Sequence, residues 1–119
     1  MRTNNIPMLT SVLMNTNITS DPVDIPDIYG YAIQAVYTGT PTGTLKLQAS
    51  ADPFKYSGTP QAPTNWTDIA NSSVDITAAG NYMWNVTGSF YNYVRVVYTD
   101  TSGGTSTAHL TVTANIKGA

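Results

Sequence analysis

The region 91–116, YNYVRVVYTDTSGGTSTAHLTVTANI, constrains the fold more than any other part of the chain. Apolar residues recur at every second position on both sides of Gly103-Gly104, which is typical of β-strands with one dry and one wet face. The pattern predicts two long strands that pair as a hairpin through the Gly-Gly turn. We expect core faces at Val94, Val96 and Tyr98 and along Ala108–Ile116, with Tyr93, Arg95, Val97 and Thr99 on the opposite face.

Alternation upstream, weak at 8–19 and strong at 31–38, predicts further strands near 8–19, 31–38, 44–50, 66–69, 73–77 and 82–86. The turn-forming residues 38–43 favour a second hairpin, between 31–38 and 44–50. Short strands at this spacing, with no helical pattern, predict an all-β fold: a single antiparallel β-sandwich, jelly-roll-like, with about eight strands. Residues 28–119 are expected to form the sandwich. Residues 1–27 are expected to supply an N-terminal arm plus a first edge strand. The segment from Ser20 that contains Pro22 and Pro26 is expected to be a loop or a short edge strand, because proline cannot donate to a ladder.

The charge composition excludes several functional classes. The chain has five Lys and Arg residues against seven acidic ones, all of them Asp, so no basic stripe exists to neutralise phosphates and no nucleic-acid partner is expected. The longest apolar run near the N-terminus is Val12-Leu13-Met14, which supports neither a signal peptide nor a membrane span. The chain also lacks cysteine, so disulfides do not hold it together.

No catalytic arrangement is evident, and the protein is predicted not to be an enzyme. His109 is the only histidine and lies mid-strand, without a nucleophile motif such as G-x-S-x-G in the sequence. Asp68 and Asp75 have no spacing that identifies a glycosidase pair. We therefore expect no catalytic residue and no cofactor.

Three aspartates, Asp21, Asp24 and Asp27, are spaced by three in a proline-containing loop. Calcium binds to several oxygen ligands that converge from such loops, with Asp52 or Asp100 as possible additions. Aspartate more often caps turns, and that interpretation is favoured here. No metal is predicted.

Aromatic residues are the more informative candidates for contact with another molecule. Tyr91, Tyr93, Arg95 and Val97 are too apolar for a wet strand face and form the candidate interface. The long irregular segment 52–65 and its surroundings supply the candidate loop contacts, Phe54, Tyr56 and Trp66. Trp84, between Tyr82 and Val86 at a period of two, is predicted to lie in the core.

Several segments, in order, resemble small all-β structural proteins of bacteriophage virions, of the head-decoration, capsid-stabilising or appendage type. The segments are QAVYTG from Gln34, GTLKLQASAD from Gly43, NWTDI from Asn65, Ala79-Gly80 before YMWNV, YVRVVYT, and LTVTANIKG. The resemblance covers roughly 34–118 and leaves the first thirty or so residues unmatched. Its motifs are strand and turn signatures, not catalytic ones.

The resemblance implies a non-enzymatic virion component, most often a capsid-associated decoration or stabilising protein. Its expected partners are the major capsid protein or a neighbouring structural protein, with self-association into a homo-oligomer. Its expected location is the virion, assembled in the host cytoplasm without a signal peptide. The alternative, based on the aromatic residues and the 52–65 segment, is a carbohydrate-binding module in host attachment.

Overall fold

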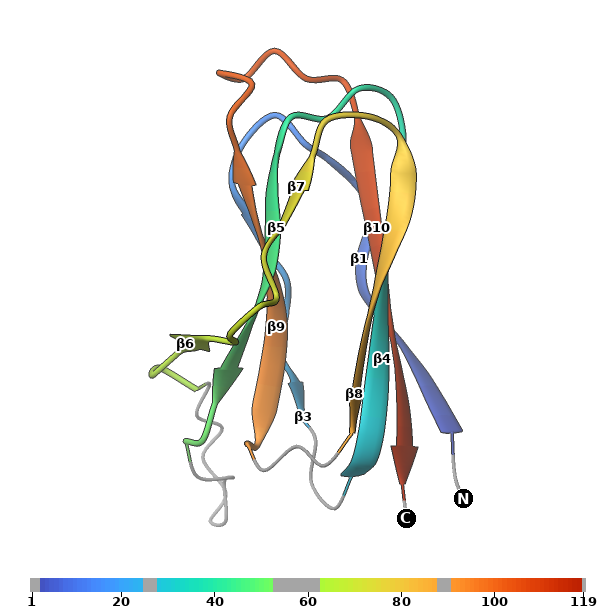
Figure 1. The fold of residues 1–119 in the computed structure, drawn as a ribbon, viewed down its shortest axis with the longest axis vertical. Coiled ribbons are helices and arrows are strands. Elements are labelled where there is room, and N and C mark those ends of the chain that lie inside the picture. Colours follow the sequence, from blue (N-terminus) through green and yellow to red (C-terminus); the bar gives the residue numbers. More distant parts are fainter. Residues whose placement is uncertain (1–2, 25–27, 53–62, 88–90, 119) are drawn as a thin grey trace.

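The computed structural model describes residues 3–24, 28–52, 63–87 and 91–118, and these form ten β-strands in two antiparallel sheets. The predicted all-β sandwich is confirmed. The first sheet has the order β1 (Thr3–Leu13), β10 (His109–Gly118), β4 (Ile28–Tyr37) and β8 (Gly80–Thr87). The second has β9 (Tyr93–Asp100) and β5 (Gly43–Ser50) at its centre. Figure 1 shows the two layers side by side, with the first sheet on the right.

Short strands form both edges of the second sheet. β2 (Ile18–Thr19) and β3 (Val23–Asp24) both pair with β9. β6 (Thr67–Asp68) and β7 (Val74–Ile76) both pair with β5 on its other side. Each edge is thus one strand broken into two pieces. The sequence already predicts separate strands near 66–69 and 73–77, so the two strands beyond the predicted eight are β2, which is separate from β1 within the predicted 8–19, and β3 in the proline-containing segment.

The connectivity is that of a jelly roll. The antiparallel pairs are nested along the chain: β1 with β10, β2 and β3 with β9, β4 with β8, and β5 with β6 and β7. The pairs β10–β4 and β9–β5 then complete the two sheets. This is a double-sheet arrangement of the jelly-roll type.

Both predicted hairpins are wrong. β9 and β10 belong to different sheets, as do β4 and β5, so the turns at 38–42 and 101–108 cross from one layer to the other. Alternation shows which face of a strand is buried but not which strand pairs with it. Two strands with a buried face can lie next to each other in one sheet or opposite each other in the two sheets of a sandwich. Sheets pack about 10 Å apart, a gap that these connections can span.

The predicted core faces are confirmed. Val94, Val96 and Tyr98 of the second sheet are buried against a first-sheet face that includes Leu110 and Val112. Trp84 is also buried, and its indole Nε1 donates to the Ser72 carbonyl at 2.9 Å. This bond ties β8, at the edge of the first sheet, to the segment between β6 and β7 of the second.

Two buried serines fill the breaks in the outer strands of the second sheet. Between β2 and β3, Ser20 donates its N–H to the Val96 carbonyl and accepts the Val96 N–H on its Oγ, both at 2.9 Å. Between β6 and β7, Ser72 Oγ accepts the Leu47 N–H at 3.1 Å and donates to the Ile69 carbonyl at 2.7 Å. A hydroxyl thus replaces the missing strand partner at each break, so the buried backbone stays satisfied.

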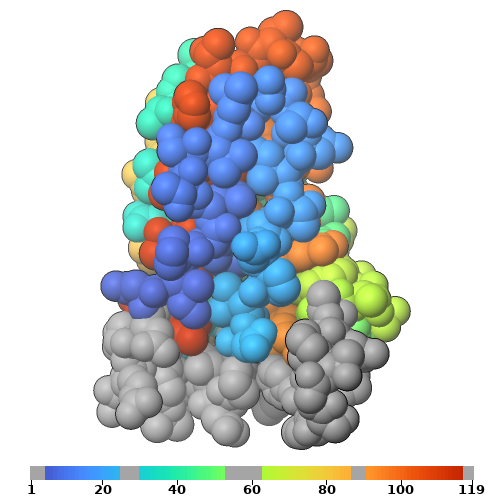
Figure 2. Space-filling view, turned by 180° about the vertical axis from the view of Figure 1, so that it is seen from behind, coloured from blue at the N-terminus to red at the C-terminus, as the bar shows by residue number. Residues whose placement is uncertain are grey.

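The N-terminal segment is part of the sandwich along residues 3–24. β1 pairs with β10 from Thr3↔Lys117 to Leu13↔His109, and β2 and β3 then pair with β9 in the opposite layer. Figure 2 shows this segment, in blue, covering one side of the molecule. The predicted boundary between residues 27 and 28 falls at the margin of the described residues and stays a prediction.

Candidate interaction site

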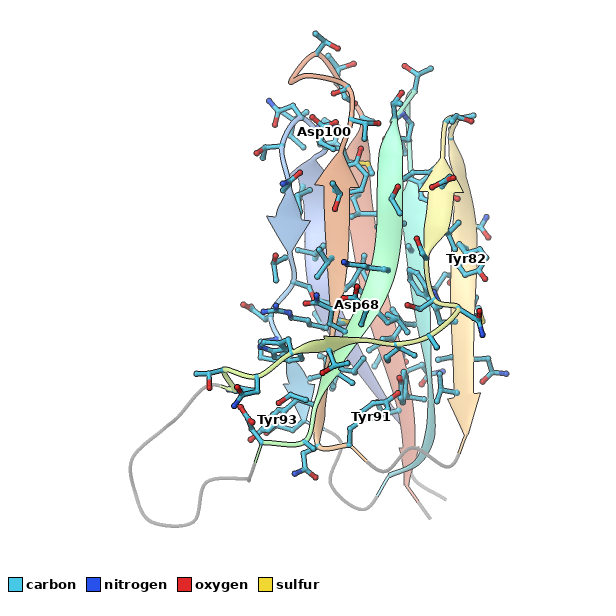
Figure 3. The ribbon with its side chains drawn as sticks, turned by 60° about the vertical axis from the view of Figure 1, so that its left-hand side comes forward. Asp68, Tyr82, Tyr91, Tyr93 and Asp100 are labelled. Atoms are coloured by element: carbon cyan, nitrogen blue, oxygen red, sulfur yellow. The ribbon has the colours of Figure 1, made fainter. Side chains whose placement is uncertain are left out.

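The four residues of the predicted interface do not form one patch. Alternation predicts Tyr91 on the outer face, but β9 begins only at Tyr93, so Tyr91 is not part of the strand. It packs instead against the core, where its hydroxyl hydrogen-bonds that of Tyr31 and the two rings meet edge to face at 6.3 Å. Figure 3 shows Tyr91 and Tyr93 near one end of the sandwich. Tyr93 is only 6% exposed, and Val97 is half-buried.

Arg95 belongs to a polar network on the outer face of the second sheet. Its guanidinium lies 4.2 Å from the centre of the Trp66 ring, and its Nε donates to Gln48 Oε1 at 2.9 Å. Gln48 in turn donates to Asp68 at 2.8 Å, and Asp68 forms an ion pair with Lys46 at 3.0 Å. The hydrogen bonds from Gln48 and Lys46 lower the pKa of Asp68, while burial lowers that of Arg95. Arg95 therefore has a hydrogen-bond partner within the chain, the side-chain carbonyl of Gln48.

Of the predicted loop contacts, Phe54 and Tyr56 lie outside the described residues. Trp66 is half-buried and donates its indole N–H to the Pro63 carbonyl at 3.2 Å. The Arg95 guanidinium occupies one face of its ring, so a stacked sugar would have only the other face available. The carbohydrate-binding alternative stays a prediction.

Two aspartates, Asp52 and Asp100, accept hydrogen bonds from backbone N–H groups outside the strands. Asp52 accepts the backbone N–H groups of Thr64 and Asn65 at 2.7 and 3.0 Å, and Asp100 accepts those of Ser102 and Gly104 at 3.0 and 3.3 Å. The side chain of Asn65 also donates to Asp52, and that of Ser102 to Asp100. These side-chain bonds, followed by the backbone bonds, lower the pKa of both carboxyl groups. Figure 3 shows Asp100 at the end of β9 where the chain crosses to the first sheet.

No metal site is formed by the described residues, which contain no group of three or more potential ligands close together. Asp24 lies in β3, and Asp27 falls outside the described residues. His109 is exposed on β10 opposite Leu13. In the described part of the chain no helix is long and apolar enough to cross a membrane.

The feature that sequence reasoning missed is the outer face of the first sheet. Lys117 is the only charged residue in the sequence of its four strands, whereas the strands of the second sheet contain Asp24, Lys46, Asp68, Asp75, Arg95 and Asp100. Lys117, two residues after Asn115, lies at the end of β10 in the register of this outer face, and no other described residue of the face carries a formal charge. We call the part without charge the charge-free face. The face consists of Asn5, Pro7, Leu13, Ala32, Gln34, Val36, Asn81, Met83, Asn85, His109, Thr111, Thr113 and Asn115.

Exposed apolar side chains are concentrated on this charge-free face. Met83 is 52% exposed, Val36 42% and Leu13 39%, and all three lie on it. The fourth large exposed hydrophobic residue, Tyr82, is 37% exposed at the β8 edge, where Figure 3 labels it. Large apolar groups together with an absence of charge are typical of the centre of a protein–protein interface.

The sequence matches no known protein family and no curated protein. Among solved structures, the fold is similar to the coat protein of Tobacco streak virus, with a TM-score of 0.48 and 11% identity over 97% of this chain and 85% of that chain. The coat protein dimer of the same virus gives a TM-score of 0.46 and 12% identity over 98% of this chain and 87% of that one. At these scores we draw no functional conclusion from the similarity.

Proposed function

We propose that this protein is a non-enzymatic structural component of a bacteriophage virion, a capsid-associated decoration or stabilising protein that acts through protein–protein contacts. The observation that carries the proposal is the charge-free outer face of the first sheet. The outer face of the second sheet carries charged side chains, including an ion pair. If the outer faces of both sheets were exposed only to water, we would expect charged residues on both of them. The jelly roll also occurs in viral capsid proteins, an analogy at the level of fold alone.

The proposed partner is the major capsid protein or a neighbouring structural protein. The charge-free face would bury Val36, Leu13 and the threonines of β10 against it, with the exposed amide side chain of Gln34 available for hydrogen bonds. Contacts of this type can be weak individually and still hold, because many copies arrayed by the symmetry of a shell bind with avidity.

A matched pair of lysine substitutions tests the proposal. Val36→Lys places a charge on the charge-free face, on the inner strand β4, and Thr99→Lys places one at an exposed position on the outer face of the second sheet. Each variant is mixed with particles from the same genome that lack this protein, and co-sedimentation is measured. We expect wild type and Thr99→Lys to bind and Val36→Lys to lose most of its binding. If wild type binds no particle, the proposal is refuted; binding to host cell-wall sugars instead would favour the carbohydrate alternative.

A further inference from the structure

The free edge of β8 differs from the other three sheet edges of this sandwich. Among the described residues β8 pairs only with β4, in unbroken register from Gly30↔Thr87 to Tyr37↔Gly80. Proteins normally protect exposed edges with prolines, bulges, charges or short strands, because an open edge recruits further strands. β8 has none of these: it is eight residues long, with no Pro and no charged residue.

Each of the other edges has at least one such protection. β1 contains Pro7, two register shifts and a positive φ of 48° at Ser11. The β2–β3 edge and the β6–β7 edge are each broken by a buried serine, and they contain Asp24, Asp68 and Asp75. Of the four edges, β8 is the one without such protection, which indicates that another strand covers it in the functional state of the protein.

We propose that β8 pairs with β8 of a second copy of this chain, antiparallel across a two-fold axis, so that the two first sheets join into one continuous sheet. Such an axis brings each residue close to its own copy, so a charged residue near it would meet a like charge. Neither β8 nor its neighbour β4 contains a charged residue. The edge is therefore electrostatically compatible with itself, which an edge adapted to a charged partner would not be.

Strand geometry and exposure identify the register. A two-fold axis normal to the sheet keeps each side chain on its own face. Residues that pair across the axis are therefore both odd-numbered or both even-numbered, and one residue of β8 must pair with its own copy at the axis. Among the described residues Met83 is the most exposed large apolar side chain, and it gains the most from burial there. With Met83 on the axis, Asn81 of one copy faces Asn85 of the other, and their amides can hydrogen-bond. On the core-facing side Tyr82 faces Trp84, extending the edge-to-face contact that these rings already make at 5.2 Å.

The absence of cysteine makes this register directly testable, since any engineered disulfide must be intermolecular. Met83→Cys places two thiols opposite each other at the axis, about 5 Å apart between Cβ atoms. Val36→Cys is the matched control, because Val36 lies on the same face and is 42% exposed but one strand further in, opposite Asn81. In the proposed dimer, Val36 of one copy is three strand spacings, about 14 Å, from Val36 of the other copy, which is too far for a disulfide.

We expect mild oxidation to convert most of Met83→Cys to a covalent dimer and to leave Val36→Cys monomeric. In sedimentation equilibrium, the wild-type protein and Val36→Lys should be dimers, whereas Met83→Lys should be a monomer. If both cysteines cross-link equally, the two faces stack instead, and if neither does, β8 does not pair with itself; either result overturns the inference. The inferred β8 dimer depends on the proposed function only in one respect, that the dimer would occur in a virion. Co-sedimentation with particles fails or succeeds independently of the cross-link, so the two can be refuted separately.

Discussion

Replacing Ser72 with alanine tests the idea that buried hydroxyls substitute for strand pairing in the second sheet. Ser72 is 4% exposed, and its Oγ accepts the Leu47 N–H at 3.1 Å while donating to the Ile69 carbonyl at 2.7 Å. Leu47 lies in the middle of β5, where neither β6 nor β7 reaches it. Alanine therefore leaves a buried N–H without an acceptor and removes a donor from a carbonyl.

An unsatisfied buried donor costs about 1–3 kcal/mol, and we expect the free energy of unfolding of Ser72→Ala to fall by about 2 kcal/mol. Urea unfolding measures this as a lower midpoint with an unchanged slope, since the compact state is the same. Ser73→Ala, at the exposed neighbouring position, is the control and should stay within about 0.5 kcal/mol of wild type. If Ser72→Ala matched Ser73→Ala, the hydroxyl would not be sealing the break and the reasoning would be refuted.

Two further predictions concern the core. Burial, followed by the hydrogen bond with Tyr91, raises the pKa of Tyr31 above its ordinary 10.0, so the folded state favours the protonated hydroxyl. Stability should be constant below about pH 10 and fall above it, and in urea unfolding from about pH 9 to 11 Tyr31→Phe should show a shallower fall than wild type; an equal fall in both would contradict this. Gly43→Ala would place its Cβ 2.3 Å from the Thr99 carbonyl oxygen and 2.6 Å from the Tyr98 ring. It should lower the free energy of unfolding by about 3 kcal/mol or more in the same urea assay, and a loss below about 1 kcal/mol would show that the two sheet strands relax around it.

The sequence predicts the faces of the strands better than their partners. Alternation correctly identifies Val96 and Leu110 as core residues, because burial depends only on which side of the pleat a residue occupies. Pairing depends on topology, and the jelly roll places β9 and β10 in different layers although an eight-residue, glycine-containing turn joins them. Alternation predicts the wrong face for Tyr91 for a related reason, since the strand that fixes the alternation begins two residues later.

The charge-free face was not predictable from alternation at all. Its residues come from four strands that are distant in the sequence, and only the strand order brings Val36, Met83 and Leu13 onto one surface. The signal is present in the sequence, as the near absence of charge from these strands, but it becomes visible only after each strand is assigned to its sheet. The buried serines are similar: Ser20 and Ser72 read as turn residues until the broken edges are seen.

The central claim is that the charge-free face of the first sheet is the surface by which this protein joins a virion. A density map of particles that carry the protein, at a resolution that shows individual strands, tests it most directly. We predict density for the sandwich on the particle, with the face of β1, β10, β4 and β8 that carries Val36 turned toward the shell. A sandwich bound through the Arg95–Trp66 face of the second sheet, with the charge-free face open to solvent, would contradict it.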